Sequence, residues 1–338
     1  MAYDDRSVKP MSSSLLRAQI GTKLLAGLYD TVPTMMTSAI RLYVDLPGAG
    51  GSAGPPFAFN IAISPAWCSG IQGARLVGRR KIDIAWLNPS CIASMAYHGR
   101  GAFRKALPLR ALAVFPSYDR LVVAVGRKWG IRSMEELKRR RPALRVSVAT
   151  NDCIDFAINA ALRAHGMSLK TFEEWGGVLD PVVRPSNPRR LEGIVSGDVD
   201  VVIDEGLSSW AGAAVEQEMA FLHFSSKAMA SLDRYGFSRA PLNGPLFDGK
   251  LPEPVTAVDF SGWPIVTHAD LPDELAYQVV GVIEQMRENI EYDTPEVPPM
   301  TQFCTDTPDG PLDLPLHPGA ERYYKEKGYL YYKEKGYL

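Results

Sequence analysis

Short apolar runs alternate with helix-length amphipathic stretches through the middle of the chain. The runs rich in β-branched residues predict strands at RVSVAT (145–150), PVVR (181–184) and DVDVVID (198–204). A helix is predicted over DCIDFAINAALRAHG, and a second begins at Asn187-Pro188 and ends before Gly197. This succession of strand and helix predicts a doubly wound parallel unit.

A similar unit precedes it. Strands are predicted at FAFNIAIS (57–64), KIDIAWLN (81–88) and LRALAVFP (109–116), with SGIQGARLVGRR and SCIASMAYHG as the helices between them. Ser133 and Glu136 have the spacing of a capping box and predict a helix over SMEELKRRR. The chain therefore carries two α/β units in succession.

The last third has a different pattern. Residues 240–262 are rich in Pro and Gly, and we expect a long connection there. WPIVT (263–267) predicts one more strand, and the helix ELAYQVVGVIEQMRENI follows Pro272. Prolines are dense from Asp293 to Pro318, so we expect that segment to follow the surface. A late segment that returns after the second unit predicts two lobes joined by crossing strands.

Composition narrows the class of protein. With 338 residues the chain is long enough for two lobes, and its net charge of -1 argues against a nucleic-acid partner. It has no run of about 20 apolar residues and no signal-peptide pattern, so we expect a cytoplasmic protein as written, or a periplasmic one if a leader was removed. The four cysteines lack metal-ligand spacing, and we expect no metal and no cofactor.

Several stretches resemble one known family. IGTKLLAGLY (20–29), DIAWLNPS (83–90), the segment 107–149, WPIVTHADLPDELAYQVV (263–280) and PLHPGAERYYKEKGYL (315–330) occur in the order found in solute-binding subunits of TAXI-type TRAP transporters. The resemblance implies the type II periplasmic-binding-protein fold, which is two-lobed and α/β, with doubly wound lobes and a central ligand cleft. Residues 1–115 and 255–330 would form lobe I, and residues 116–254 would form lobe II.

The chain ends with two copies of YYKEKGYL. The resemblance implies that the first copy completes the fold at Leu330. We therefore interpret residues 331–338 as a duplicated C-terminal tail, native or introduced, and not as a functional repeat.

Two loops depart from the family pattern. Where relatives have glycines after I-G-T, this chain has Lys23, which either supplies a point charge to a ligand or points to solvent. Where relatives have a turn rich in Gly, Ser and Thr, it has Asn151, Asp152 and Asp155. The two carboxylates either stabilise the helix N-terminus or face the cleft, where they would disfavour an anionic ligand. Asp204 and Glu205 end another strand of this lobe and add two carboxylates.

The resemblance also places other polar and aromatic residues at the cleft. Each has a structural alternative: an aromatic side chain can lie in the core, Asn88-Pro89 can be a turn, and Ser117 can belong to a hinge. These candidate ligand-binding residues are Tyr29, Asn88, Ser90, Ser117, Tyr118 and Trp263.

Two functions of different classes follow. The first is a binding protein that closes its lobes on a small organic or aromatic acid by a hinge motion and, if exported, serves TRAP membrane subunits. The second is a cytoplasmic enzyme on the same fold, such as an aromatic-acid decarboxylase that uses cleft carboxylates. No phosphate-loop, G-x-S-x-G or H-E-x-x-H motif is present, so we assign no catalytic residue. A scaffold protein is the third and least specific interpretation.

Overall fold

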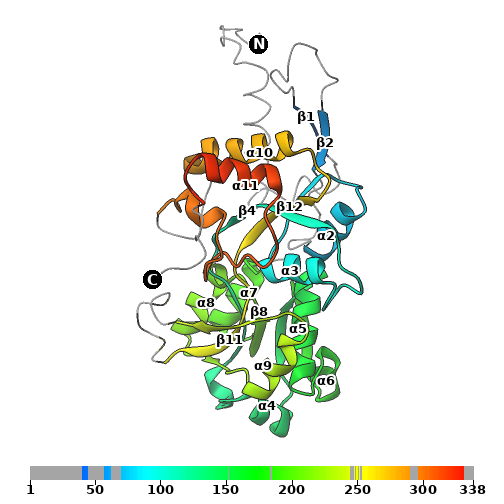
Figure 1. Ribbon diagram of the computed structural model, residues 1–338. Coiled ribbons are helices and arrows are strands. Elements are labelled where there is room, and N and C mark those ends of the chain that lie inside the picture. The colour runs from blue at the N-terminus through cyan, green and yellow to red at the C-terminus, as the bar shows by residue number, and fades with distance from the viewer. Residues whose placement is uncertain are drawn as a thin grey trace, which may run out of the picture.

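The protein is divided into two α/β lobes, stacked one above the other in Figure 1. The computed structural model describes residues 40–44, 57–61, 70–150, 152–182, 185–243, 247, 249, 251, 253–289 and 296–330. All structural statements below concern these residues. Lys23, Tyr29, Asn151 and the second octapeptide copy lie outside them.

The first lobe contains a five-stranded sheet in the order β1-β2-β3-β12-β4. Its strands are β1 (Ile40–Val44), β2 (Phe57–Ile61), β3 (Ile84–Trp86), β4 (Leu109–Phe115) and β12 (Trp263–His268). The late strand β12 lies between β3 and β4 and is antiparallel to both. A segment more than 140 residues distant along the chain therefore completes the centre of this sheet.

Helices cover the first sheet. They are α2 (Gly70–Gly78), α3 (Ser90–His98), α10 (Asp273–Met286) and α11 (Pro318–Glu326), with 3₁₀ turns η3 (Arg287–Asn289) and η4 (Met300–Phe303). Figure 1 shows α10 and α11 side by side at the end of the lobe remote from the second lobe.

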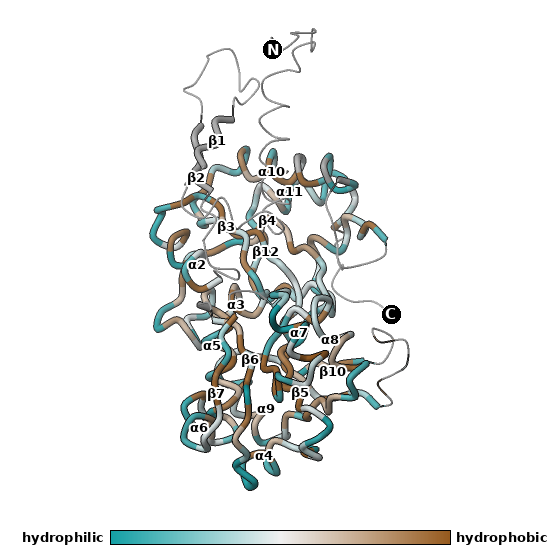
Figure 2. The backbone as a smooth tube through the Cα atoms, turned by 180° about the vertical axis from the view of Figure 1, so that it is seen from behind, coloured by the Kyte–Doolittle hydropathy of each residue, from teal (hydrophilic) through white to brown (hydrophobic). Residues whose placement is uncertain are grey.

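The second lobe contains a seven-stranded sheet in the order β10-β11-β5-β8-β6-β7, with β9 paired to β5. Its strands are β5 (Arg120–Val125), β6 (Arg145–Ala149), β7 (Val178–Val182), β8 (Val201–Asp204), β9 (Ala220–Phe221), β10 (Arg239–Leu242) and β11 (Val255–Asp259). β6 runs parallel to β7 and β8, as the strand–helix succession predicts. Figure 2 shows hydrophobic chain along β5, β6 and β7 and hydrophilic chain in the loops at the far end of the lobe.

The second lobe has six α-helices in its described part, and their ends follow from local sequence. They are α4 (Met134–Arg140), α5 (Asp152–Ala164), α6 (Leu169–Glu174), α7 (Pro188–Ser196), α8 (Leu207–Glu216) and α9 (Ser226–Asp233), with the 3₁₀ turn η1 (Arg127–Trp129). As predicted, Ser133 Oγ accepts a hydrogen bond from the Glu136 amide, and Asn187 Oδ1 accepts one from the Arg189 amide. The predicted helix stop at Gly197 is also confirmed.

The prediction of a long connection over residues 240–262 is wrong. β10 and β11 lie in this segment and pair with each other, and β11 also pairs with β5. Pro241 is compatible with β10 because β10 is an edge strand of the sheet. The dense Pro and Gly residues concealed these strands in the sequence.

The position of β11 also moves the lobe boundary. We placed Val255–Asp259 in lobe I, but the structure pairs this strand with the second sheet. The chain therefore crosses between lobes at residues 116–119, between β4 and β5, and at residues 260–262, between β11 and β12. We refer to these two stretches as the crossing segments.

The first YYKEKGYL copy is built into the first lobe. Tyr324 is fully buried, and its hydroxyl donates to the Leu112 carbonyl at 2.9 Å. The hydroxyls of Tyr323 and Tyr329 both donate to the carboxylate of Glu284 on α10. Through these contacts the first copy packs against β4 and α10 of the first lobe.

Candidate functional site

The crossing segments lie side by side and hold the lobes together. The Gly262 amide donates to the Ser117 carbonyl at 3.0 Å, and the Phe260 amide donates to the Asp119 carbonyl at 3.1 Å. The Ser90 amide, at the start of α3, donates to the Ser261 carbonyl at 3.1 Å. Loops from both lobes therefore converge at the crossing, where we expect a ligand site in a fold of this kind.

A buried polar network occupies the crossing segments. Arg120 is 4% exposed, and its Nη1 donates to Asp259 Oδ1 at 3.0 Å and to Ser261 Oγ at 2.5 Å. Its guanidinium also lies 4.1 Å from the ring centre of Tyr118. Burial raises the pKa of Asp259, and the positive charge of Arg120 opposes that shift. We call Asp119, Arg120, Asp259 and Ser261 the crossing network.

Asp119 links this network to α8 of the second lobe. Its carboxylate accepts hydrogen bonds from the Gly206 amide at 2.9 Å and the Leu207 amide at 3.4 Å. A helix N-terminus has unsatisfied N–H groups and a partial positive charge, so a carboxylate is a favourable partner there. The chain's own Asp119 thus occupies the anion-binding position at this helix end.

The carboxyl end of β8 carries a second buried charge pair. Arg190 and Asp204 are both fully buried, with Nη1 2.5 Å from Oδ2, and Arg190 Nε donates to Ser147 Oγ at 2.9 Å. Burial raises the pKa of Asp204, while Arg190 favours its ionised form. Removing either partner would leave a buried charge without compensation, so this pair belongs to the support of the second lobe.

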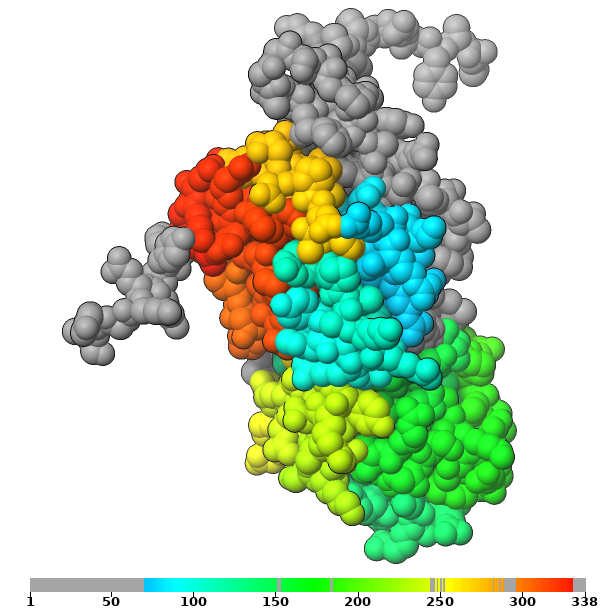
Figure 3. All heavy atoms as spheres, turned by 45° about the vertical axis from the view of Figure 1, so that its right-hand side comes forward, coloured from blue at the N-terminus to red at the C-terminus, as the bar shows by residue number. Residues whose placement is uncertain are grey.

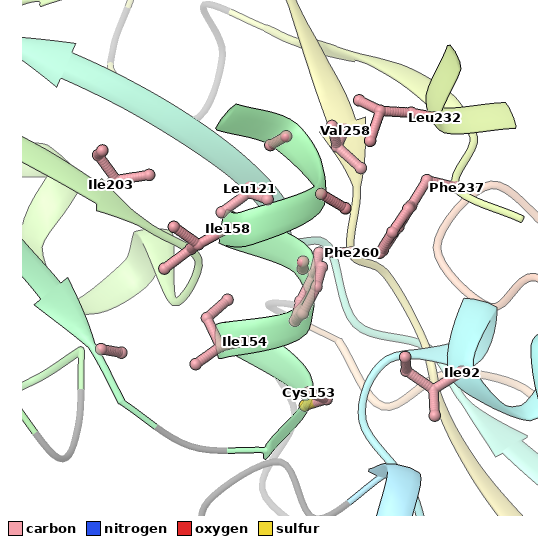
Figure 4. Close-up of a cluster of buried hydrophobic side chains, with 14 of the residues drawn as sticks. Ile92, Leu121, Cys153, Ile154, Ile158, Ile203, Leu232, Phe237, Val258 and Phe260 are labelled. Atoms are coloured by element: carbon pink, nitrogen blue, oxygen red, sulfur yellow. The ribbon is translucent and has the colours of Figure 1, made fainter. Parts of the chain in front are cut away.

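The lobes also meet through apolar contacts. One hydrophobic cluster contains residues from both lobes, and Figure 4 shows Ile92 of α3, Phe260 of the crossing segment and Cys153 at the start of α5 within it. Cys153 Sγ donates to the Asn88 carbonyl at 3.2 Å. The β3–α3 loop therefore rests against the N-terminal end of α5.

A polar cavity of about 60 Å³ remains between the lobes. Ser90, Cys91 and Ser94 of α3 line one part of it, together with Arg100 from the segment that follows α3. Figure 3 shows this segment (cyan) lying directly against the region of α9 and β10 (yellow-green). We call this space the junction cavity.

The rest of the cavity wall comes from distant parts of the chain. Ser238 and Asp259 belong to the second lobe, Ser261 to a crossing segment, and Asp313 to the proline-rich segment before α11. Asp313 Oδ2 accepts a hydrogen bond from Ser94 Oγ at 2.6 Å and lies 3.2 Å from Arg100 Nη2. Both lobes and a crossing segment thus contribute polar groups to one space.

Ser90 differs from the other polar residues of the cavity wall in its hydrogen bonding. Its side chain is 3% exposed, and its hydroxyl has no hydrogen-bond partner among the described residues. A Cβ atom on Gly262 would lie 2.3 Å from Ser90 Oγ, and Gly262 has a φ of +77°, so only glycine suits that position. The Ser90 hydroxyl therefore packs against the backbone of Gly262 and is covered by the crossing segment.

The predicted site residues fall into several different environments. Ser90 lines the junction cavity; Asn88, Ser117 and Glu205 are buried at the lobe junction; and Tyr118 packs on Arg120. Trp263 is 4% exposed and packs with Trp86 in the core of the first lobe. This core position is the alternative to ligand contact that the sequence left open for Trp263. Asp155 is half-buried on α5, and burial raises its pKa. Asp152 is the first residue of α5, and its side chain is not among those the structure describes.

Sequence reasoning missed most of the polar wall. In the adjoining crossing network, Asp119 and Arg120 directly follow the predicted Ser117 and Tyr118, and the order S-Y-D-R was the available signal for them. Arg100, Asp259, Ser261 and Asp313 gave no comparable signal, because their partners are distant in sequence. No group of three metal-ligating side chains occurs in the described ranges, and no helix there is long and apolar enough to cross a membrane.

One family model and several solved structures match parts of this chain. Residues 262–328 match the sequence model of the NMT1-like family. A protein bound to L-arginine is 12% identical with a TM-score of 0.32, and the match covers 65% of this chain and 66% of that protein. A Xanthomonas citri protein bound to chloride ion is 10% identical with a TM-score of 0.35, over 78% and 81% of the two chains.

A TctC solute-binding protein from Polaromonas is 13% identical with a TM-score of 0.35, over 66% and 71% of the two chains. The predicted two-lobed α/β architecture is confirmed by the two sheets and their crossing segments.

Proposed function

We propose that this protein binds a small solute between its two lobes and closes on it by a hinge motion at the crossing segments. The observation that carries this proposal is the junction cavity, whose polar wall combines both lobes with a crossing segment. A ligand that touches both lobes at once favours the closed arrangement over an open one, because only the closed state supplies all of its contacts.

The finer assignment rests on the order of sequence motifs. We propose a receptor of the TAXI type, and the resemblance makes an organic acid the first expectation for its ligand. The NMT1-like match over residues 262–328 supports a solute-binding role and covers β12, α10 and α11 of the first lobe. Delivery of the solute to membrane subunits of a transporter belongs to the same proposal.

Nothing specific in the cavity favours the decarboxylase alternative. Asp204, one of the carboxylates considered for proton transfer, is fully buried and paired with Arg190. Burial raises the pKa of the Cys91 thiol far above its usual value, so this cysteine is protonated and a poor nucleophile.

A thermal-shift screen against small solutes, followed by recovery of each hit, tests the proposal. Ligand at 100 times its dissociation constant should add about 2.7 kcal/mol to the free energy of unfolding. We expect the hit to be recovered chemically unchanged after prolonged incubation. A hit that is consumed contradicts the binding role, and so does a hit whose stabilisation survives substitutions throughout the junction cavity.

A further inference from the structure

Two turns that contain glycine meet beside the junction cavity, one from each lobe. The Arg100–Gly101 turn follows α3 in the first lobe, and Gly101 has a φ of +60°. The Tyr235–Gly236 turn follows α9 in the second lobe, and Gly236 has a φ of +99°. Arg100 and Gly236 both line the cavity. We call these two turns the glycine contact.

The two turns approach each other too closely for further side chains. A Cβ atom on Gly101 would lie 2.5 Å from the Tyr235 carbonyl oxygen across the junction and 2.5 Å from Met95 Sδ in its own lobe. A Cβ atom on Gly236 would lie 2.8 Å from Arg100 Nε, also across the junction. Ordinary contacts of a Cβ atom are 3.4 Å or longer, so a methyl group at either position must displace its neighbour.

Packing alone joins the two turns. Among the described residues, no hydrogen bond or ion pair runs from one turn to the other. The Arg100 side chain is held from its own lobe instead, by Ser94 Oγ at 2.9 Å and Asp313 Oδ2 at 3.2 Å. The crossing segments, in contrast, are joined by backbone hydrogen bonds. The lobes therefore separate at the glycine contact without breaking a hydrogen bond between the turns, while the crossing segments keep them connected.

We propose that the glycine contact controls the hinge equilibrium. Because both turns lack a side chain where they meet, the lobes pack together there, and a methyl group at this point shifts the equilibrium towards separated lobes. Packed contacts of this kind convert a small local displacement into a rotation of one domain against the other. This inference rests on the hinge motion of the proposed function and names the residues that set its balance.

Cys153 reports on the separation of the lobes. It is fully buried, and its Sγ donates to the Asn88 carbonyl of the first lobe at 3.2 Å. With Ile92 it belongs to the apolar cluster that spans the lobes (Figure 4). A thiol reagent must displace these first-lobe contacts to reach it. Cys304 is the internal reference, because it is 3% exposed within the core of the first lobe alone.

Thiol labelling of two alanine variants tests the proposal. N-ethylmaleimide under native conditions, followed by peptide mass spectrometry, gives a labelling rate for each cysteine of the full chain. Gly101→Ala should raise the rate at Cys153 by about fivefold or more over its control, as an overpacked contact does, and leave the rate at Cys304 equal to that of the control. Gly130→Ala is the matched control, because Gly130 has a φ of +61° and nothing within 4 Å of an added Cβ.

Gly236→Ala tests the glycine contact from the second lobe. Its methyl group meets the side chain of Arg100, which moves more readily than the Tyr235 backbone, so we expect a smaller rise of about twofold at Cys153. Gly197→Ala is its control, with a φ of +78° and nothing within 4 Å of the added Cβ. This second pair decides the matter if Gly101→Ala does not fold.

The outcomes separate this inference from the proposed function. If Cys153 reacts faster than Cys304 in the wild type, but each variant matches its control, the hinge motion stands and the role of the glycine contact is wrong. Equal acceleration at Cys153 and Cys304 would mean general destabilisation and would overturn the inference too. If Cys153 reacts no faster than Cys304 in the wild type, the lobes separate only on unfolding, and the hinge motion itself is wrong.

Discussion

Two polar clusters meet at the lobe junction, and they differ in how completely their groups are satisfied. In the crossing network, Arg120 is 4% exposed and bonds Asp259, Ser261 and the carbonyl of Pro241. In the junction cavity, the Arg100 side chain is 41% exposed and Ser90 Oγ has no partner among the described residues. A completed buried cluster stabilises a fold, whereas an incomplete one at a cavity is suited to a ligand.

The largest effect should come from breaking the completed cluster. Arg120→Met removes the cationic partner of Asp259, whose side chain is 16% exposed and keeps a hydrogen bond from the Ser261 amide, and we expect a loss of about 1.5–3 kcal/mol in the free energy of unfolding. Arg100→Met is the matched control and should cost no more than about 1 kcal/mol, because this arginine is partly exposed. Urea denaturation measures both, and equal losses would mean that the clusters do not differ as described.

Removal of the carboxylate that reaches α8 should have the next largest effect. Asp119→Ala deletes the acceptor for the Gly206 and Leu207 amides, and we expect a loss of about 1–2 kcal/mol. Amide hydrogen exchange should accelerate at these two positions, while the amides of α4 at the far end of the lobe stay protected. Unchanged exchange at Gly206 and Leu207 would show that Asp119 does not stabilise this helix end.

The stabilisation that Asp313 provides at the junction cavity should depend on pH. Burial works to raise the pKa of Asp313, but hydrogen bonds from Ser94 and His98 and the charge of Arg100 outweigh it, so this pKa lies below its usual value. The associated stabilisation is complete above the unfolded-state pKa of about 3.9 and disappears as the pH falls through the lowered folded-state value. The melting temperature of the wild type should exceed that of Asp313→Asn at pH 6, and the two should converge in stronger acid. A difference in melting temperature that grows as the pH falls would contradict a lowered pKa of Asp313.

The smallest effect is expected for Ser90, in comparison with Ser261, a second buried serine. Ser261→Ala removes the Oγ that accepts from Arg120, and we expect a loss of about 1–2 kcal/mol. Ser90→Ala removes a hydroxyl without a partner in the described structure, so the ligand-free protein should lose less than about 0.5 kcal/mol or gain stability. Thermal unfolding in ligand-free buffer compares them, and a Ser90 loss as large as that of Ser261 would remove the distinction between the clusters.

Local chemistry explains which parts of the fold were predictable. The helix starts at Ser133 and Asn187 depend on residues two or three positions away, so the sequence reveals them directly. β10 and β11 were not predicted because Pro241 and the surrounding Pro and Gly residues are typical of a loop. Pro241 is compatible with a strand only because β10 lies at the edge of the sheet, which the sequence does not show. The shift of β11 to the second lobe follows from its pairing with β5, which local sequence does not specify.

The site was less predictable than the fold because its contacts span long separations. Ser90 was predicted in the loop after a strand, and it begins α3 beside the junction cavity. Ser94 and Asp313 are 219 positions apart, and Arg120 and Asp259 are 139 apart, so no window of sequence contains either pair. Asp204 was placed at its strand end, but its burial against Arg190 became evident only from the three-dimensional arrangement.

Small-angle X-ray scattering with and without a cavity ligand tests the central claim most directly. The account predicts that the free protein has a larger radius of gyration than the closed arrangement described here. Saturating ligand should reduce the radius of gyration of the wild type to the value of the arrangement described above. A ligand that binds with full occupancy while the radius of gyration stays constant would contradict closure of two lobes around a solute.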